Sequence, residues 1–191
     1  MYHVPNVYPN AYSYYGHLPM DNHGRYPAYW NVQNGANHTM QWLPLQSQQE
    51  RNQIELKDYG SAPFVVNINK ATKQNRNYRT ALWTGRHLQV TLMSLKVGED
   101  IGLEIHPTVD QFLRIEQGQG IVQMGNRKDN LYFRRKVSDD DAIMIPAGTW
   151  HNVTNTGNVP LKLYSIYAPP NHPFGTVHRT KANAMAAEHG H

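Results

Sequence analysis

Cysteine is absent from all 191 residues of the sequence. This absence excludes disulfide frameworks, thiolate zinc sites and cysteine nucleophiles. Long apolar runs are missing as well, since none approaches the roughly 18 residues that a membrane-spanning helix needs. The N-terminus also lacks the basic and apolar regions of a signal peptide. We therefore expect no signal peptide, no transmembrane segment and no membrane partner.

Positively charged residues are in slight excess but are not concentrated in any one part of the sequence. The chain carries 18 Lys and Arg residues against 14 Asp and Glu residues, a formal net charge of +4. The basic residues form neither a long block nor a helical stripe, so we expect no nucleic-acid partner. Hydrophobic residues make up 39% of the chain, a low share for a compact domain. Part of the sequence is therefore predicted to lie outside a single core.

Residues 1–49 account for that part. They are rich in Tyr, Asn, Pro, His, Gln and Gly and show neither a helical nor a strand period. Several prolines interrupt any long helix in this stretch. The composition predicts a disordered arm, or an arm that contacts a partner or an assembly. After it we expect one domain over residues 50–171 and a short C-terminal tail over 172–191.

The stretch that follows the arm carries only short signals of regular structure. Ser47 in the N-cap position predicts a helix over 47–58. Alternating apolar residues predict a strand over 64–69. The polar residues 71–78 are expected to form a loop or a single helical turn.

Beyond residue 79 the sequence alternates apolar and polar positions with a period of two, and Gly, Pro, Asn or Asp bounds each run. Short, regularly spaced strands with turn signals predict an all-β sandwich or barrel with little helix. The closing residues 180–189 are expected to be a frayed helix or disordered. The predicted strands cover residues 80–84, 87–95, 101–105, 111–115, 120–124, 132–137, 142–145, 150–154 and 162–167.

Two of these strands carry candidate metal ligands. Glu104 and His106 are two residues apart, so on a strand both side chains leave the same face. His151 adds a second imidazole on a later strand. A carboxylate and two imidazoles directed at one point are a donor set that divalent metals accept.

The spacing of these residues resembles the two sequence motifs of the cupin superfamily, and the resemblance extends over about residues 64–171. The phrases around 110–118 and 160–173 are similar to single-domain bacterial cupins described as mannose-6-phosphate isomerase-like. The resemblance implies a double-stranded β-helix, or jelly-roll, barrel. In the second motif Asp140 replaces the leading glycine. The positions that match are Gly98, His106, Gly118, Pro146, Gly148, His151 and Asn155.

Two departures from the first motif concern the metal ligands. Glu104 stands where the family has a histidine, and Gln111 stands where it has a glutamate. The four ligand positions together therefore keep the same charge as in the family, but the carboxylate comes from position 104 instead of position 111. The resemblance implies a divalent ion, Zn, Mn, Fe, Ni or Co, held by Glu104, His106, Gln111 and His151. Two other arrangements remain open, an ion pair of Glu104 with Arg114 and a Gln111 that only hydrogen-bonds a metal-bound water.

The metal set suggests an enzyme-like site for a small polar or sugar-like molecule in the barrel. Isomerase or lyase chemistry, which we favour over dioxygenase chemistry, needs a general acid or base near the metal. Tyr167 is the candidate if its hydroxyl, with that of Ser165, reaches the cavity, and Glu104 is a second candidate. A sugar-binding module would use the same pocket without catalysis.

The alternative is a structural or assembly protein that uses the barrel as an oligomerising scaffold. The composition of residues 1–49 is similar to that of coat proteins of spore-forming bacilli. The expected location is accordingly cytoplasmic or spore-coat-associated. Cupin barrels commonly pair through edge strands, so a homodimer or larger homo-oligomer is expected in either case.

Overall fold

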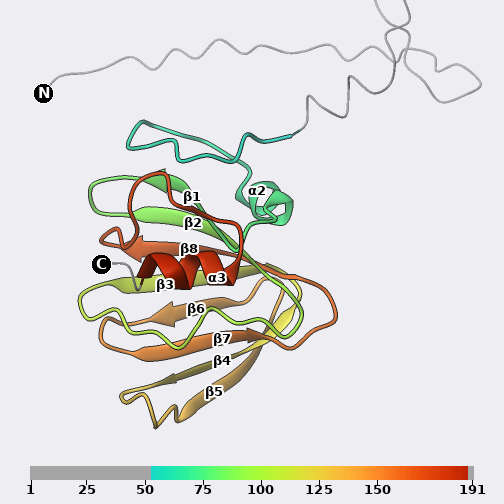
Figure 1. Cartoon of the computed structure of the whole chain (residues 1–191), viewed down its shortest axis with the longest axis vertical. Coiled ribbons are helices and arrows are strands. Elements are labelled where there is room, and N and C mark those ends of the chain that lie inside the picture. The colour runs from blue at the N-terminus through green and yellow to red at the C-terminus, as the bar shows by residue number, and fades with distance from the viewer. Residues whose placement is uncertain (1–52, 189–191) are drawn as a thin grey trace, which may run out of the picture. The chain divides into compact units, whose positions relative to one another are not determined.

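The computed structural model describes residues 53–188, so the predicted arm over 1–49 lies outside the described residues. Nine strands and two helices form within this range (Figure 1). None of its helices is both long enough and apolar enough to cross a bilayer. The elements are α2 (Ile68–Gln74), β1 (Arg79–Thr84), β2 (Gln89–Leu95), β3 (Asp110–Gln117), β4 (Gln119–Gly125), β5 (Phe133–Ser138), β6 (Ala142–Ile145), β7 (Trp150–Asn155), β8 (Leu161–Ala168), β9 (Val177–His178) and α3 (Lys181–Glu188).

The strands form two antiparallel sheets, which confirms the predicted all-β jelly-roll class. One sheet has six strands in the order β6-β3-β8-β2-β1-β9, and the other has three in the order β5-β4-β7. Leu113 and Leu163 from the larger sheet and Val122 and Val153 from the smaller one belong to a single buried apolar cluster. This shared core holds the two sheets together, because each strand buries alternate side chains.

Most predicted strands are present, but the stretch 101–105 is an exception. It forms no strand and pairs with β7 through a single isolated bridge, which joins Glu104 to His151. Gly102 adopts a φ of 88°, which interrupts the pleat, and its amide donates to the Asp100 carboxylate at 2.6 Å. Alternation of residue types therefore misidentified a looped segment as a strand.

The segment before β1 also differs from prediction. Residues 53–58, the described part of the predicted helix, are not helical, and the predicted strand over 64–69 gives way to α2. Asn67 caps α2 by accepting the Lys70 amide at 2.9 Å. Asn prefers such caps because its side chain competes for backbone hydrogen bonds.

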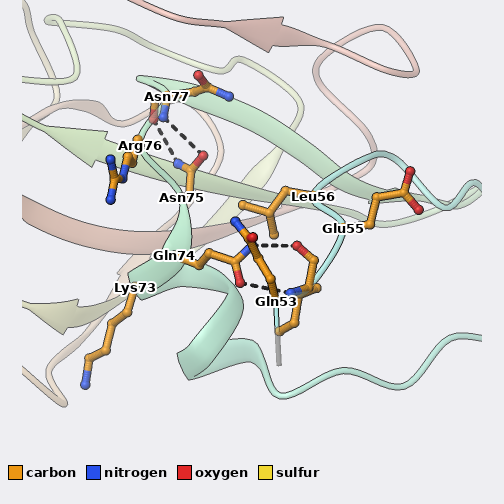
Figure 2. A pocket seen from close by; sticks show the side chains of 9 residues that line it. Gln53, Glu55, Leu56, Lys73, Gln74, Asn75, Arg76 and Asn77 are labelled. Atoms are coloured by element: carbon orange, nitrogen blue, oxygen red, sulfur yellow. Dashed lines mark hydrogen bonds between the residues drawn. The ribbon is translucent and has the colours of Figure 1, made fainter. Parts of the chain in front are cut away.

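This segment packs on the outer face of the larger sheet. Leu56, Phe64 and Ile68 contact a buried cluster that includes Leu82 of β1 and Leu92 of β2. The Ile54 amide donates to the side-chain oxygen of Gln74 at 2.9 Å, beside an open polar hollow (Figure 2). The start of the described chain is thus attached to the barrel through apolar contacts and one side-chain clamp.

The interior of the barrel divides into two halves along the strands. On β8 the inward residues run from Leu161 and Leu163 to Ser165 and Tyr167, and all are fully buried. Leu163 lies opposite apolar residues on β2 and β3, whereas Tyr167 lies opposite a glutamine on each. One end is therefore an apolar core, and the other end is a cluster of buried polar side chains, called the polar chamber below, in which function is to be sought.

Asp140, at the glycine position of the second motif, has a φ of 70° and is the only non-glycine residue within 53–188 with a positive φ. Aspartate tolerates this conformation better than most residues. Its carboxylate also pairs with Arg114 on the protein surface. The substitution of glycine by aspartate is thus compatible with the turn.

We expect Asp140→Gly to change the free energy of unfolding by less than about 1 kcal/mol, because relief of the left-handed backbone is offset by the lost surface ion pair and added chain entropy. Asp140→Ala should lower the free energy of unfolding by about 1–2 kcal/mol, since alanine keeps the backbone strain and also lacks the carboxylate. Urea unfolding of both variants measures the difference. Equal stabilities would contradict the role assigned to the turn.

Candidate metal centre

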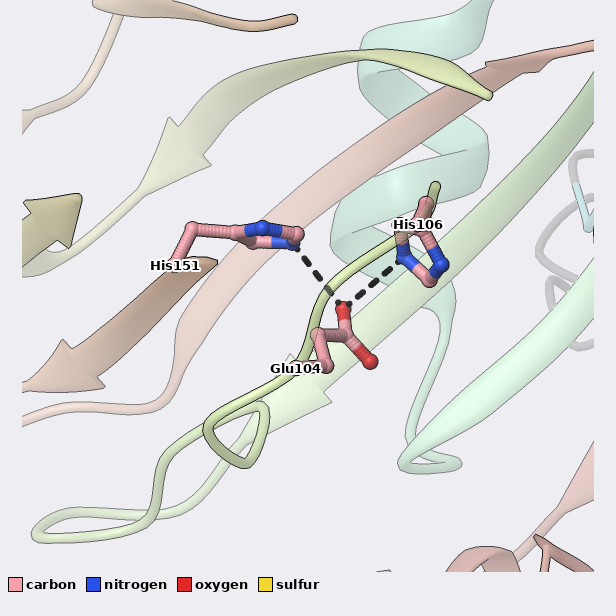
Figure 3. Close-up of side chains that lie close together, drawn as sticks. All are labelled: Glu104, His106 and His151. Atoms are coloured by element: carbon pink, nitrogen blue, oxygen red, sulfur yellow. Dashed lines mark ion pairs between the residues drawn. The ribbon is translucent and has the colours of Figure 1, made fainter. Parts of the chain in front are cut away.

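The polar chamber contains three converging side chains, Glu104, His106 and His151 (Figure 3). His151 projects from β7, and Glu104 is held beside it by a pair of backbone hydrogen bonds of 3.1 and 3.0 Å. The backbone oxygen of His106 accepts the Gly148 amide at 2.8 Å. The two sequence motifs are therefore joined by main-chain contacts that bring their ligand candidates together.

The distances within this group fit metal ligands better than hydrogen-bond partners. Oε1 of Glu104 lies 3.4 Å from Nε2 of His106 and 3.3 Å from Nε2 of His151. All three atoms are buried and have no hydrogen-bond partner among the described residues. Ligands about 2.1 Å from one ion lie about 3.0–3.4 Å apart, depending on coordination geometry. The residues present therefore fit a divalent ion.

His151 is oriented as a metal-binding histidine would be. Its Nδ1 lies 2.9 Å from the backbone oxygen of Thr149, and its side chain is completely buried. A carbonyl can only accept, so Nδ1 carries the proton and donates it, and Nε2 is the ring nitrogen directed toward Glu104. Such an outer hydrogen bond fixes the tautomer of metal-ligating histidines.

Glu104 is ionised in this setting. Burial alone would raise the pKa of its carboxyl group, but contacts with His106 and His151 and the positive charge of Arg79 lower it to about 2. Arg114, the alternative partner considered from the sequence, instead pairs with Asp140 on the protein surface. The chamber thus holds a permanent carboxylate, the form that binds cations.

Gln111 and Tyr167 lie opposite each other on β3 and β8, and both are buried. Nε2 of Gln111 donates to Oγ of Ser165 at 3.0 Å, while its Oε1 is buried without a hydrogen-bond partner in the described part of the chain. The ring of Tyr167 meets His106 edge-on, with ring centroids 5.6 Å apart. Both residues therefore belong to the same polar chamber as the group of three.

Sequence reasoning did not single out Gln89 and Arg79, which also belong to this chamber. Gln89 on β2 and Arg79 on β1 are buried. His172 lies beyond the last long strand, and its ring is 5.0 Å from that of Tyr167. An inward-facing glutamine in an apolar strand was a usable signal for Gln89. The position of His172 after the last strand allows it to close over the barrel mouth, with a solvated tail as the default expectation, and in the structure a long-range contact brings it to the barrel.

The fold and this site define a β-barrel protein with a chamber suited to a divalent metal. Residues 91–167 match the Cupin domain family, and the chain belongs to the cupin superfamily.

The chain is also similar to proteins along nearly its whole length. It is 65% identical over 188 residues to the uncharacterized protein YrkC of Bacillus subtilis (strain 168), covering 98% of this chain and 100% of that protein. The crystal structure of BH2720 from Bacillus halodurans is 73% identical, with a TM-score of 0.68 over 68% of this chain and 98% of that one. Protein L612 of Acanthamoeba polyphaga mimivirus is 45% identical over 115 residues, covering 60% of this chain and 70% of L612. The superfamily is given by the Cupin domain match, and the isomerase-like type stays a proposal.

Proposed function

We propose that this cupin is a metal-dependent enzyme acting on a small polar or sugar-like substrate, by isomerase or lyase rather than dioxygenase chemistry. One observation carries the proposal. Three buried ligand atoms, from Glu104, His106 and His151, lie within 4.8 Å of one another. None of them has a hydrogen-bond partner among residues 53–188. Leaving such groups unsatisfied is costly, and an ion would satisfy all three at once.

The donor set leaves several metals possible. Two imidazoles and a carboxylate occur in catalytic zinc sites and in non-haem iron sites, and both kinds keep positions open for water or substrate. Gln111 offers a fourth, neutral oxygen from β3, either to the ion or to a water bound to it. Zn, Mn, Fe, Ni and Co all remain candidates.

A bound ion would act as a Lewis acid that polarises a carbonyl or enediol of the substrate. Tyr167 is placed to exchange a proton with such a substrate, because it is buried beside His106 at the polar end of the barrel. Glu104 is better suited to hold the metal, since a carboxyl group with a pKa of about 2 is a weak base. We therefore assign proton transfer to Tyr167, and we assign to Glu104 the negative charge that holds the metal.

The assembly alternative rests on residues 1–49, which lie outside the described residues. The sugar-binding alternative uses the same chamber and omits proton transfer by Tyr167. Homodimerisation stays a prediction in each case, to be measured by light scattering of the full chain.

Elemental analysis of the full chain, purified without a histidine tag, tests the metal. We expect close to one divalent ion per chain, and its loss in Glu104→Ala and in His151→Ala. His87→Ala is the matched control, because His87 is exposed between β1 and β2. The chain has eleven histidines, so retention of the ion in both site variants would assign it to other residues and contradict the proposal.

A further inference from the structure

The chain crosses back to the barrel after β8 and places His172 against the polar chamber. The side chain of Gln89, which is fully buried on β2, makes three hydrogen bonds with the backbone of this returning segment. Its Oε1 accepts the amides of Asn171 at 3.3 Å and His172 at 3.0 Å, and its Nε2 donates to the backbone oxygen of His172 at 2.9 Å. A buried glutamine thus clamps the backbone that carries His172.

The residues that follow are attached to the barrel as well. The Ala81 amide donates to the backbone oxygen of Thr176 at 2.8 Å, and β9 pairs with β1. Lys181 pairs with Asp100 at 2.7 Å, and Ala184 of α3 is buried in the main core. His172 is therefore held at both ends of its segment, and its position is defined by the fold.

The ring of His172 continues a series of edge-on contacts that starts at the metal centre. The Tyr167 ring meets two histidine rings edge-on, His106 at 5.6 Å and 85° and His172 at 5.0 Å and 90°. Nε2 of His172 is buried and has no hydrogen-bond partner within the described chain. A buried nitrogen of this kind calls for a partner that residues 53–188 do not supply.

We propose that His172, positioned by Gln89, is a substrate-binding residue that hydrogen-bonds an oxygen of the substrate beside Tyr167. This inference rests on the proposed function, because it needs a ligand that is also bound at the metal. It implies a substrate with at least two oxygen functions, one directed to the metal ligands and one to His172.

The side chains around His172 match a substrate that presents neutral oxygen groups to them. Burial, and next the positive charge of Arg79, lower the pKa of His172 to about 3, so the imidazole is uncharged. Tyr167, Ser165 and Gln111, which are buried nearby, also present neutral polar groups. Hydroxyl and carbonyl oxygens match these partners, so the substrate class is a small hydroxy-carbonyl compound.

Two probes that differ by one hydroxyl test this inference on the zinc-loaded full chain. They are 1,3-dihydroxypropan-2-one and 1-hydroxypropan-2-one, whose affinities calorimetry can compare. We expect the wild type to prefer the dihydroxy probe by about five- to tenfold, the effect of one net hydrogen bond. The preference should vanish in His172→Phe and persist in the exposed control His87→Phe. In chain labelled with ¹⁵N-histidine, the dihydroxy probe should shift the Nε2 resonance of His172.

Gln89→Leu tests the positioning role. It should abolish the preference in the wild-type background and have no further effect in His172→Phe, since it acts through that ring. Thermal unfolding of each variant separates loss of fold from loss of preference, and the ¹⁵N shift in the wild type requires no substitution.

The outcomes distinguish this inference from the proposed function. A chain that binds no metal overturns the proposed function. A metal-loaded chain that binds neither probe, shows no preference, or keeps its preference in His172→Phe overturns the role of His172 while leaving the metal centre intact.

Discussion

Glu104→Gln is expected to weaken divalent-metal binding by at least about 100-fold, because loss of even an outer partner of a ligand costs about 10- to 100-fold. Glutamine keeps the size and one oxygen but removes the only carboxylate of the three-residue group. The two remaining donors are imidazoles, which bring no negative charge to the ion. Competition titration against a chelator with a metal-sensitive absorbance measures the change.

Adding Gln111→Glu to that variant is expected to recover most of the lost affinity. Gln111 is buried at the polar end of β3, so the double variant returns a carboxylate to the chamber from another strand. This is the placement of the carboxylate in the common cupin motif. The matched control is Glu104→Gln with Gln117→Glu, which restores the same charge at the far end of β3 and should recover nothing.

A double variant no better than its control would show that the position of Gln111 cannot supply a ligand. The Gln111→Glu change alone has a separate expected cost. Two carboxylates in one chamber repel each other, so the metal-free protein should be less stable than the wild type and regain stability on metal addition.

Leu163→Ala is expected to lower the free energy of unfolding by about 2–5 kcal/mol, the usual cost of removing a core leucine. Leu163 is fully buried on β8 and lies opposite Met93 and Ile115 on the adjacent strands. Denaturant unfolding of the full chain measures the loss. Metal stoichiometry under native conditions should stay unchanged, because Leu163 belongs to the apolar half of the barrel.

Met144→Ala is the control for the core variant. Met144 also lies on a strand of the larger sheet but is 65% exposed, so its substitution should change the free energy of unfolding by less than about 0.5 kcal/mol. Equal losses in the two variants would contradict the division between the inward and outward faces of that sheet.

Local pattern was sufficient to predict most of the barrel. Alternation of period two reports which side chains point inward, and this property depends only on neighbouring residues. The same reasoning failed at 101–105 and at 64–69, where Gly102 and the Asn67 cap override alternation. The ligand candidates Glu104, His106 and His151 could be named in advance because their spacing follows a motif.

The contents of the chamber needed the folded chain. Strand register places Gln89 and Gln111 on either side of Tyr167, and register depends on pairing between residues far apart in sequence. His172 reaches the chamber only because the chain crosses back and Gln89 holds it there. Sequence spacing therefore identified the candidate metal ligands Glu104, His106 and His151, whereas long-range contacts, which local sequence pattern does not record, place Gln89 and His172 beside Tyr167.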